Sequence, residues 1–316
     1  MIKLNTTGQT VKTWQSFLIQ KGYLKGDADG IFGPLTQAAT KAFQTAKGLV
    51  ADGIVGNNTL RKAAEDGFTA PDSAKPQPGF PLPNTIDAVF DLSHYNPNPE
   101  FVRAKAAGMI AVFHKATDGL CPTPEDTKHC VDGTYADGKA AAQKAGLLWG
   151  AYHFGRNEAG AKQADHFLDV TGIRGNVLPV LDFEPVTDKA GKVLSSTMLP
   201  DQAVKFVERI KERTGKYPGL YSGASYLREL ENNSQNHTAL SQLKNQCWLW
   251  LAEYGHKPNP PADWQWTFWQ YTDGTSGPWA PKQADGKPLD GVNAYDRSLF
   301  NGDEAALRTF WESHSI

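Results

Sequence analysis

The sequence predicts an α/β protein in two parts, an irregular parallel β/α barrel preceded by a small three-helix domain. Three observations support this prediction. A Pro-rich segment divides the 316 residues into a short part and a long part. The short part repeats one turn-and-helix pattern, and in the long part short apolar runs alternate with helical patterns.

Composition limits the possible functions. Hydrophobic residues make up 40% of the chain and charged residues 21%, so the chain can bury a core. The net charge is −2 and there is no basic run, so no nucleic-acid partner is expected. No segment approaches the roughly 20 apolar residues of a membrane span, and the opening 15 residues lack the apolar run of a signal peptide.

Residues 70–84 read APDSAKPQPGFPLPN and have no apolar periodicity, as is typical of an extended linker. The predicted organisation is therefore a first domain over residues 1–68, a linker over 69–85 and a second domain over 86–316.

Within the first domain, residues 29–36 (DGIFGPLT) and 52–59 (DGIVGNNT) follow the same pattern. Each segment is predicted to be a turn that leads into a helix, with glycine supplying positive φ and the apolar pair pointing inward. Helix faces are expected at Val11, Trp14, Phe17 and Leu18 and again at Ala39, Ala42 and Phe43. The result is a compact three-helix unit.

Seven apolar runs in the second domain are predicted to be strands, several of them apolar on both faces as buried parallel strands are. Helical patterns lie between them, and a final strand is expected at Asp296. This alternation predicts a sheet closed into a TIM-barrel-like barrel with fewer helices in its last third. The seven runs cover residues 89–93, 110–116, 147–154, 177–184, 218–223, 247–254 and 268–272.

Polar side chains gather at the C-terminal ends of these strands. A charge at the end of a buried strand is costly unless it is paired or faces a cleft, and barrel active sites lie at that end. The pattern therefore predicts one acidic cleft. Its candidate residues are Asp91, Ser93, His94, Lys115, Tyr152, His153, Asp182, Glu184, Tyr221, Glu253, Gln270 and Asp296.

The tripeptide Asp182-Phe183-Glu184 is the most informative element of this set. Residues i and i+2 of a strand point to the same side, so the two carboxyl groups are expected close together while Phe183 faces the helices. Repulsion and partial burial raise the pKa of at least one of them, which allows a carboxylic acid to donate a proton near neutral pH.

Three cysteines leave at least one thiol unpaired. Cys121 and Cys130 flank a Pro-containing loop and form either a disulfide or two free thiols, and Cys247 is expected to be a buried thiol. No CxxC or HxxxH spacing is present, so no metal site and no cofactor are predicted.

Ordered motifs across residues 88–302 resemble glycoside hydrolase family 25. This resemblance implies an N-acetylmuramidase of lysozyme type that cuts the β-1,4 bond after N-acetylmuramic acid in peptidoglycan. The matching motifs are DLSHYN from Asp91, KATDG from Lys115, AGLLWGAYHF to Phe154, LDFE to Glu184, YSG from Tyr221, LWLAEYG to Gly255, WQYTDG from Trp269, and Asp296 followed by FNG at 300–302.

Carried over by motif, Glu184 matches the general acid, and Asp182 matches the residue that stabilises positive charge and orients the acetamido group of the sugar. Asp91 and Asp296 match positions on the cleft floor that hold these two carboxyl groups. Retention of configuration by substrate assistance is predicted, since neither carboxylate then needs to act as nucleophile. Candidates for substrate contacts are Tyr152, Tyr221, Trp269, Gln270, Glu253 and Lys115, whereas His153 is expected to be structural.

The first domain resembles the peptidoglycan-binding domain of wall hydrolases, through Gln15, Phe43-Gln44, Gly48-Leu49 and the two DG segments. The glycines and apolar positions of that pattern are interpreted as building the fold, and ligand contacts are not assigned. Peptidoglycan is the expected partner of a monomeric protein. The second domain departs from the usual family residues at Asn96, Asp118 and Gly138, and the loop from Cys121 to Cys130 resembles an insertion.

Two other functions fit part of this pattern. A non-catalytic wall-binding protein would keep both domains without the acids, and a related enzyme could cut chitin instead of peptidoglycan. Without a signal peptide, the enzyme is expected to stay cytoplasmic until it is released to act in the periplasm or on the cell wall. Both a phage endolysin and a delivered toxin with an immunity partner match that expectation.

Overall fold

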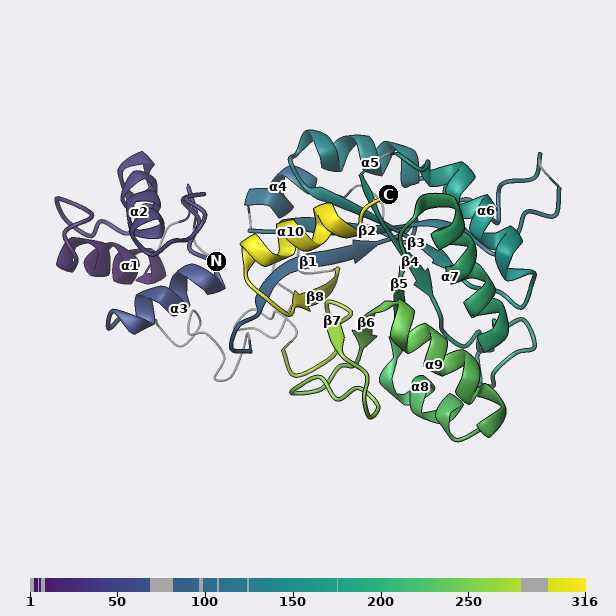
Figure 1. Cartoon of the computed structure of the whole chain (residues 1–316). Helices are drawn as coiled ribbons and strands as arrows, with labels where there is room; N and C mark the ends of the chain where they lie inside the picture. The colour runs from purple at the N-terminus through teal and green to yellow at the C-terminus, as the bar shows by residue number, and fades with distance from the viewer. Residues whose placement is uncertain are drawn as a thin grey trace.

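The computed structural model describes residues 3, 4, 6, 9–68, 82–96, 99–106, 108–123, 125–174, 176–279 and 295–316 (Figure 1). The segment 69–81, which holds most of the predicted linker, lies outside the described residues. None of the helices described in these ranges has the length and apolar character that crossing a bilayer requires.

The first domain contains α1 (Gln9–Gln20), α2 (Pro34–Ala46) and α3 (Asn57–Glu65). Their facing side chains form a separate core around Trp14, Phe17 and Phe43. The predicted helix faces are present except that Ala42 is exposed. Of the apolar pair in the first turn, only Phe32 is buried while Ile31 is 54% exposed, whereas both Ile54 and Val55 of the second turn are buried.

A buried glutamine holds each of the two repeated turns in the same way. The side-chain amide of Gln15 donates to Asp29 Oδ1 (2.7 Å), Ile31 O (3.0 Å) and Thr36 Oγ1 (3.0 Å), and accepts from Gly30 N (2.8 Å). Gln44 makes the equivalent four contacts with the second turn, at 2.6 to 3.1 Å. These polar residues of the repeat therefore also build the fold, in addition to the glycines and apolar positions for which the sequence predicted that role.

Eight strands form a closed barrel in which each strand pairs with its neighbours in chain order. The pairings from β1 to β7 are parallel, whereas β8 runs antiparallel to both β1 and β7. The predicted irregular β/α barrel is thus confirmed, with its last strand reversed. The strands are β1 (Ile86–Leu92), β2 (Ala111–Asp118), β3 (Leu148–Phe154), β4 (Val177–Asp182), β5 (Gly219–Gly223), β6 (Trp248–Ala252), β7 (Trp266–Thr272) and β8 (Asp296–Phe300).

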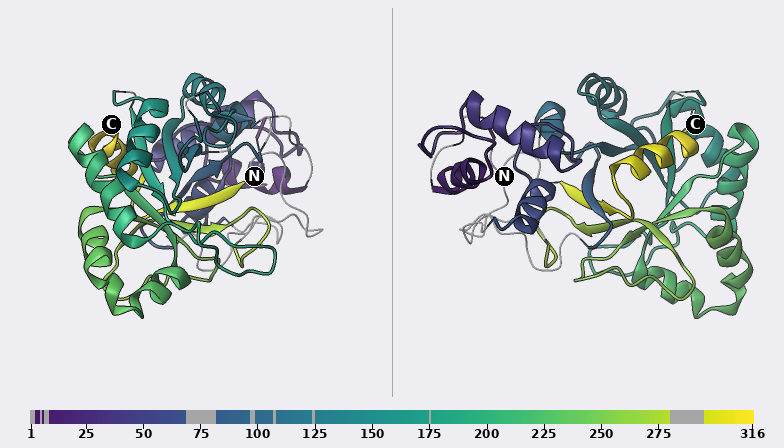
Figure 2. Two further views of the ribbon diagram at one scale, coloured as in Figure 1. Left: turned by 90° about the vertical axis from the view of Figure 1, so that its right-hand side faces the viewer. Right: turned by 60° about the vertical axis from the view of Figure 1, so that its left-hand side comes forward.

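Helices cover the outside of this barrel, and the larger apolar core lies between them and the strands (Figures 1 and 2). On α7, the predicted face of Ala203, Phe206, Val207 and Ile210 is fully buried. No helix lies in the described segment between β6 and β7, where a regular alternation would have one, in line with the expected loss of helices in the last third. The covering helices are α4 (Phe101–Ala106), α5 (Tyr135–Lys144), α6 (Gly160–Thr171), α7 (Pro200–Thr214), α8 (Ala224–Glu231) and α9 (His237–Gln246).

A second apolar cluster fills the inside of the barrel and includes Phe113, Trp250 and Phe268. The C-terminal helix α10 (Glu304–His314) contributes Trp311, whose ring lies 5.1 Å from that of Phe113. Its indole nitrogen also donates to Trp149 O, at the start of β3. This helix therefore closes the end of the barrel where the parallel strands begin, and leaves the opposite end for a site.

Cys121 and Cys130 form a disulfide, which settles the alternative that the sequence left open, and Cys247 is a free, partly buried thiol. The disulfide closes the loop that follows β2. Backbone bonds from Asp118 N to Cys130 O (2.9 Å) and from Asp132 N to Ala116 O (2.9 Å) attach this loop to the strand.

Candidate active site

The alternation of side chains along the strands brings the predicted acids to one end of the barrel. Asp91 and Asp182 lie near the C-terminal ends of β1 and β4, and Asp296 is the first residue of β8. Because β8 is antiparallel, its first residue pairs with Asp91 in the register. A reversed last strand thus delivers its carboxylate to the same rim as the parallel strands.

Gln270 connects this group. Its side chain is 1% exposed, and its amide nitrogen donates to Asp91 Oδ2 (2.9 Å) and Asp296 Oδ2 (3.2 Å). The amide oxygen accepts from the hydroxyl groups of Tyr221 (2.8 Å) and Tyr254 (3.1 Å). Gln270 therefore organises the carboxylates, and these contacts occupy its amide.

Asp182 and Glu184 form the second half of the site. Phe183 between them is fully buried, with its ring 5.5 Å from Tyr226 of α8, so it faces the helices as predicted. Burial raises the pKa of Glu184 to about 7, against the lowering effect of its hydrogen bond with Asp182. Burial and then the charge of Glu184 raise the pKa of Asp182 well above its usual range. At neutral pH this pair holds at least one proton.

One oxygen of this pair has no partner. Asp182 Oδ1 is buried and makes no hydrogen bond to any residue that the structure describes. A buried carboxylate oxygen without a donor is unfavourable in the free protein. It is therefore an acceptor available to a donor on a bound molecule.

The other two acids and the two tyrosines of the site also have raised pKa values. Burial raises the pKa of Asp296 to about 6, and burial followed by the charge of Asp296 raises the pKa of Asp91. Tyr152 and Tyr221 are partly exposed, and burial and the neighbouring carboxylates raise the pKa of each hydroxyl. Both rings thus lie beside the acids with their hydroxyl protons retained.

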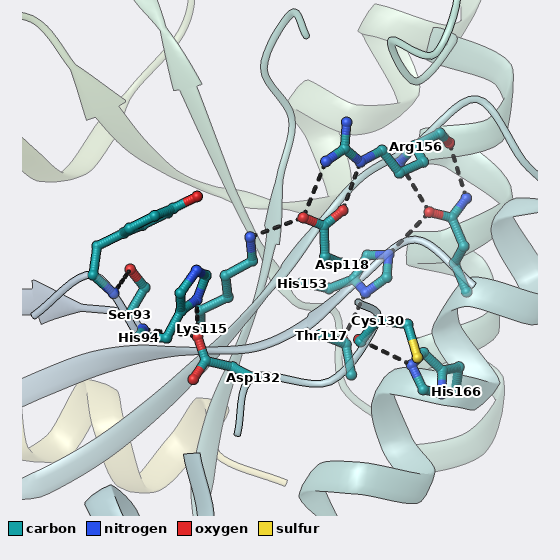
Figure 3. Close-up of polar contacts among 12 residues, drawn as sticks. Ser93, His94, Lys115, Thr117, Asp118, Cys130, Asp132, His153, Arg156 and His166 are labelled. Atoms are coloured by element: carbon teal, nitrogen blue, oxygen red, sulfur yellow. Dashed lines mark hydrogen bonds and ion pairs between the residues drawn. The ribbon is translucent and has the colours of Figure 1, made fainter. Parts of the chain in front are cut away.

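A chain of opposite charges joins Lys115, Asp118 and Arg156 (Figure 3). Lys115 Nζ donates to Asp118 Oδ2 (2.9 Å), and Arg156 donates to both oxygens of Asp118 from Nε (2.5 Å) and Nη2 (3.0 Å). The charge of Lys115 also lowers the pKa of Asp182. Lys115 is therefore part of the site but is paired with Asp118.

One predicted substrate contact, Trp269, is contradicted by the geometry. Trp269 is fully buried in the core outside the barrel, where its Nε1 donates to Glu253 O (2.6 Å), so its ring cannot stack on a sugar. It is adjacent to the inward-pointing Gln270 and therefore points outward. Glu253 is half-buried and accepts from Asn259 N through Oε2 (2.7 Å), and its contact with substrate stays a prediction.

Outside the acid cluster, the remaining predicted polar residues have structural partners. His153 is buried between Thr117 Oγ1 (2.7 Å) and Gln163 Oε1 (3.0 Å), and burial lowers its pKa to about 4, so its expected structural role fits. His94 pairs with Asp132 at 2.9 Å (Figure 3), and Ser93 N bonds Asn96 Oδ1 at 3.0 Å.

Sequence reasoning missed Tyr254, which is 39% exposed and bonded to Gln270. The available signal was its place at the end of an apolar strand run, next to Glu253. Among the described residues, metal-ligating atoms come together at Cys121, Cys130 and His166, and the two sulfurs are bonded to each other.

Comparisons with known proteins agree with this arrangement. The model for Glycosyl hydrolases family 25 matches residues 90–278, and a peptidoglycan binding domain model matches residues 7–62. Lysozyme M1 of Streptomyces globisporus is 31% identical over 69% of this chain and 68% of its own length. The uncharacterized protein YegX of Escherichia coli O157:H7 is 30% identical over 63% of this chain and 61% of its own length.

Among solved structures, the family GH25 lysozyme from Aspergillus fumigatus superposes with a TM-score of 0.53 at 27% identity, covering 73% of this chain and 100% of that one. The family 25 match covers more than half of the chain and contains Asp91, Asp182 and Glu184. The chain is therefore a glycoside hydrolase that belongs to family 25 and carries a peptidoglycan-binding domain at its N-terminal side.

Proposed function

We propose that this enzyme is an N-acetylmuramidase that hydrolyses the β-1,4 bond between N-acetylmuramic acid and N-acetylglucosamine in peptidoglycan. One observation carries the proposal: Glu184, whose pKa is about 7, lies beside Asp182, whose buried Oδ1 has no partner among the described residues. The first side chain can donate a proton at neutral pH, and the second can accept a hydrogen bond from substrate. The lysozyme M1 relative supports the same activity.

The first step breaks the glycosidic bond. Glu184 donates its proton to the leaving oxygen while the N-acetyl carbonyl oxygen of the muramic acid attacks the anomeric carbon from the opposite face. Asp182 Oδ1 accepts the N–H of that acetamido group and stabilises the positive charge on the resulting five-membered ring. The proton thus leaves Glu184, and the electrons of the broken bond stay on the departing sugar.

The second step consumes water. The Glu184 carboxylate takes a proton from a water molecule, whose oxygen attacks the anomeric carbon and reopens the ring. Two inversions at one carbon give net retention, so the first product has the β configuration. An α-configured first product in an NMR time course would contradict this pathway.

Gln270 prepares the site for both steps. It fixes Asp91 and Asp296 at 2.9 and 3.2 Å from one amide nitrogen, and the charge of Asp296 raises the pKa of Glu184. The raised pKa keeps Glu184 protonated before the first step. We propose that Asp91 and Asp296 act through the electrostatic effect of their charges and do not bond to the reacting atoms.

The peptidoglycan-binding domain is proposed to hold the enzyme on the insoluble wall. Linking a binding module to a catalytic one raises the effective concentration of the second site without changing its chemistry. Both cell-lysis roles predicted from the sequence, a phage endolysin and a delivered toxin, use this activity. Co-purification of a neutralising partner from the source cell would favour the toxin.

The test is digestion of purified peptidoglycan by the wild-type protein and by Glu184→Gln, with borohydride reduction and mass spectrometry of the released fragments. Wild-type protein is expected to produce fragments with reduced muramic acid, and the variant to lose at least about 100-fold of the rate. Glu312→Gln removes an exposed carboxylate on α10 and serves as the matched control.

Four results would contradict the proposal. Unchanged activity of Glu184→Gln excludes it as the acid, and reduced N-acetylglucosamine in place of muramic acid identifies a different bond. Binding of wild-type protein to peptidoglycan without any release would favour the non-catalytic wall-binding protein. Release of sugars from chitin at a comparable rate would favour the N-acetylglucosamine polymer.

A further inference from the structure

A pocket of about 330 Å³ opens beside the acid cluster, at the ends of β2 and β3. Its walls come from the loops after β2, β3 and β4 and include Asp118, Gly119, His129, Arg156 and Ser196. The proposed reaction uses none of these residues. The proposed reaction therefore does not explain what this pocket binds.

Arg156 is held rigidly in the wall of this pocket. Its Nε and Nη2 both donate to Asp118, and its guanidinium lies 4.6 Å from the centre of the Phe154 ring. Its backbone N donates to Gln163 Oε1 at 2.9 Å. A planar guanidinium fixed by two bonds and an aromatic face loses little entropy when it binds a ligand.

Gly119 permits this placement. Its φ is +57°, and a Cβ on this residue would lie 2.7 Å from Arg156 Cγ and 2.9 Å from Glu158 Oε2. Glu158 Oε2 in turn accepts from Leu120 N at 2.7 Å. The loop after β2 thus packs directly against the arginine stem and engages the nearby carboxylate.

One donor group of Arg156 stays available. Its Nη1 makes no hydrogen bond to the residues that the structure describes, and in Figure 3 one guanidinium nitrogen points away from Asp118. Lys115 and Arg156 together carry two positive charges against the single negative charge of Asp118 between them. Glu158, which also lines the pocket, adds a second negative charge, so these four side chains together are neutral and the attraction for an anion rests on the donor group at Arg156 Nη1.

The charged residues of this pocket and the carboxyl group of Asp182 in the reaction centre influence each other. Asp182 responds to the charges of both Lys115 and Asp118, and Arg156 responds to the charge of Asp182. The geometry agrees, since Gly155 N, next to Arg156, donates to Asp182 O at 2.9 Å. Phe154 also pairs with Asp118 on one side and Asp182 on the other. A sugar held at Asp182 can therefore extend a substituent into the pocket.

We propose that Arg156 is a specificity-determining residue that binds a carboxylate of the peptide stem on the muramic acid in this pocket. The inference rests on the proposed muramidase function. In peptidoglycan the muramic acid carries, through its lactyl group, a peptide with free carboxylates. Without a cationic group, the four acids of the cleft would repel such a stem, and arginine is the side chain best suited to a carboxylate.

The test compares two soluble substrates that differ only in the stems: glycan strands that keep their peptides, and the same strands after an amidase has removed them. The value of kcat/KM is measured on both for wild-type protein, Arg156→Gln and Arg156→Lys. Arg174→Gln, which removes an exposed arginine beyond α6, is the control. Unfolding midpoints of all variants are measured in parallel.

Wild-type protein is expected to prefer the stem-bearing strands about tenfold, which one charge-assisted hydrogen bond supplies. Arg156→Gln should reduce that preference to about one, and Arg156→Lys to an intermediate value, because lysine keeps the charge without the two bonds to Asp118. Arg174→Gln should keep the wild-type preference. If Arg156→Gln fails to fold, Arg156→Lys still reports the ratio.

Other outcomes overturn the inference. Equal kcat/KM values of wild-type protein on both substrates would show that the enzyme does not recognise the stem, and the proposed muramidase function would be unaffected. An equal loss on both substrates in Arg156→Gln assigns the arginine a structural role through Asp118. Failure of wild-type protein to cleave either substrate refutes the proposed function itself, which is a distinguishable result.

Discussion

Replacing Gln270 with glutamate tests the role assigned to this residue, since it exchanges an N–H donor for an acid of the same shape. The amide nitrogen lies 3.2 Å from Asp296 Oδ2, and the pKa of Asp296 is about 6, so Asp296 is ionised at pH 7. Two ionised carboxylates at that separation repel by about 5 kcal/mol at an effective dielectric constant of about 20.

Keeping the introduced carboxyl protonated is the less costly alternative. For a group with an ordinary pKa of about 4.3, retaining a proton at pH 7 costs about 3.7 kcal/mol, at about 1.36 kcal/mol for each pH unit. The folded variant is therefore expected to hold one proton that its unfolded chain releases. Protein stability falls with rising pH when the folded state binds more protons.

The expected result for Gln270→Glu is a free energy of unfolding close to the wild-type value at pH 4. It should then decrease by about 1.36 kcal/mol per pH unit, to about 3.7 kcal/mol below wild type at pH 7. Denaturant unfolding followed by tryptophan fluorescence reports mainly on the barrel, because eight of the nine tryptophans lie between positions 149 and 311.

The control is Gln235→Glu, which introduces the same charge at an exposed position. It should follow the wild-type curve within about 0.5 kcal/mol at every pH. A difference between Gln270→Glu and wild type that changes by less than about 1 kcal/mol from pH 4 to pH 7 would refute the reasoning. Gln270 would then not lie between two carboxylates.

Three further predictions follow from the structure. The pKa of Glu184 in the free protein is about 7 and the acid must be protonated, so kcat/KM on soluble glycan should fall as pH rises through about 7. A kcat/KM that stays constant to pH 9 would exclude Glu184 as the acid. Replacing Cys121 and Cys130 by serine should lower the free energy of unfolding by about 2.6 kcal/mol, the value expected for a 9-residue separation. A dithiol should then leave the stability of the variant unchanged. If a dithiol destabilises the variant as much as wild type, the bond that it reduces is not the one between Cys121 and Cys130. Gln15→Leu and Gln44→Leu should each destabilise the first domain by about 2 to 4 kcal/mol, measured by hydrogen exchange of α1 and α2 in the full chain; values that differ by more than about 2 kcal/mol would contradict their equivalence.

Most of the barrel could be predicted because apolar runs and helix faces are local patterns. The seven strand predictions match β1 to β7 closely, and the four buried residues of α7 follow the 3.6-residue period. The direction of β8 could not be predicted, since a five-residue strand has no local signal for its orientation. Pairing with both β1 and β7 fixes that direction.

The site residues likewise divide into those that a local sequence pattern predicts and those that depend on long-range contacts. Asp91, Asp182 and Asp296 were identifiable because a carboxylate at the end of an apolar strand is unusual. Trp269 was misassigned because composition alone suggests a sugar platform, although the period of two already places it opposite Gln270. The contacts of Gln270 with Asp91 and Tyr254 depend on how distant strands meet around the barrel, and no short-range pattern contains that information.

Closure of the barrel by β1 and β8 has a consequence for how the enzyme gains activity during refolding. Asp91 of β1 and Gln270 of β7 are 179 residues apart in the chain, and the buried pair of Asp87 of β1 and Arg297 of β8 is 210 residues apart. Contacts of such long range form slowly, because a large loop must close before they gain any energy. During refolding, the spectroscopic signal of the helices should therefore recover before catalytic activity does. The return of muramidase activity should report when β1 and β8 pair and close the barrel.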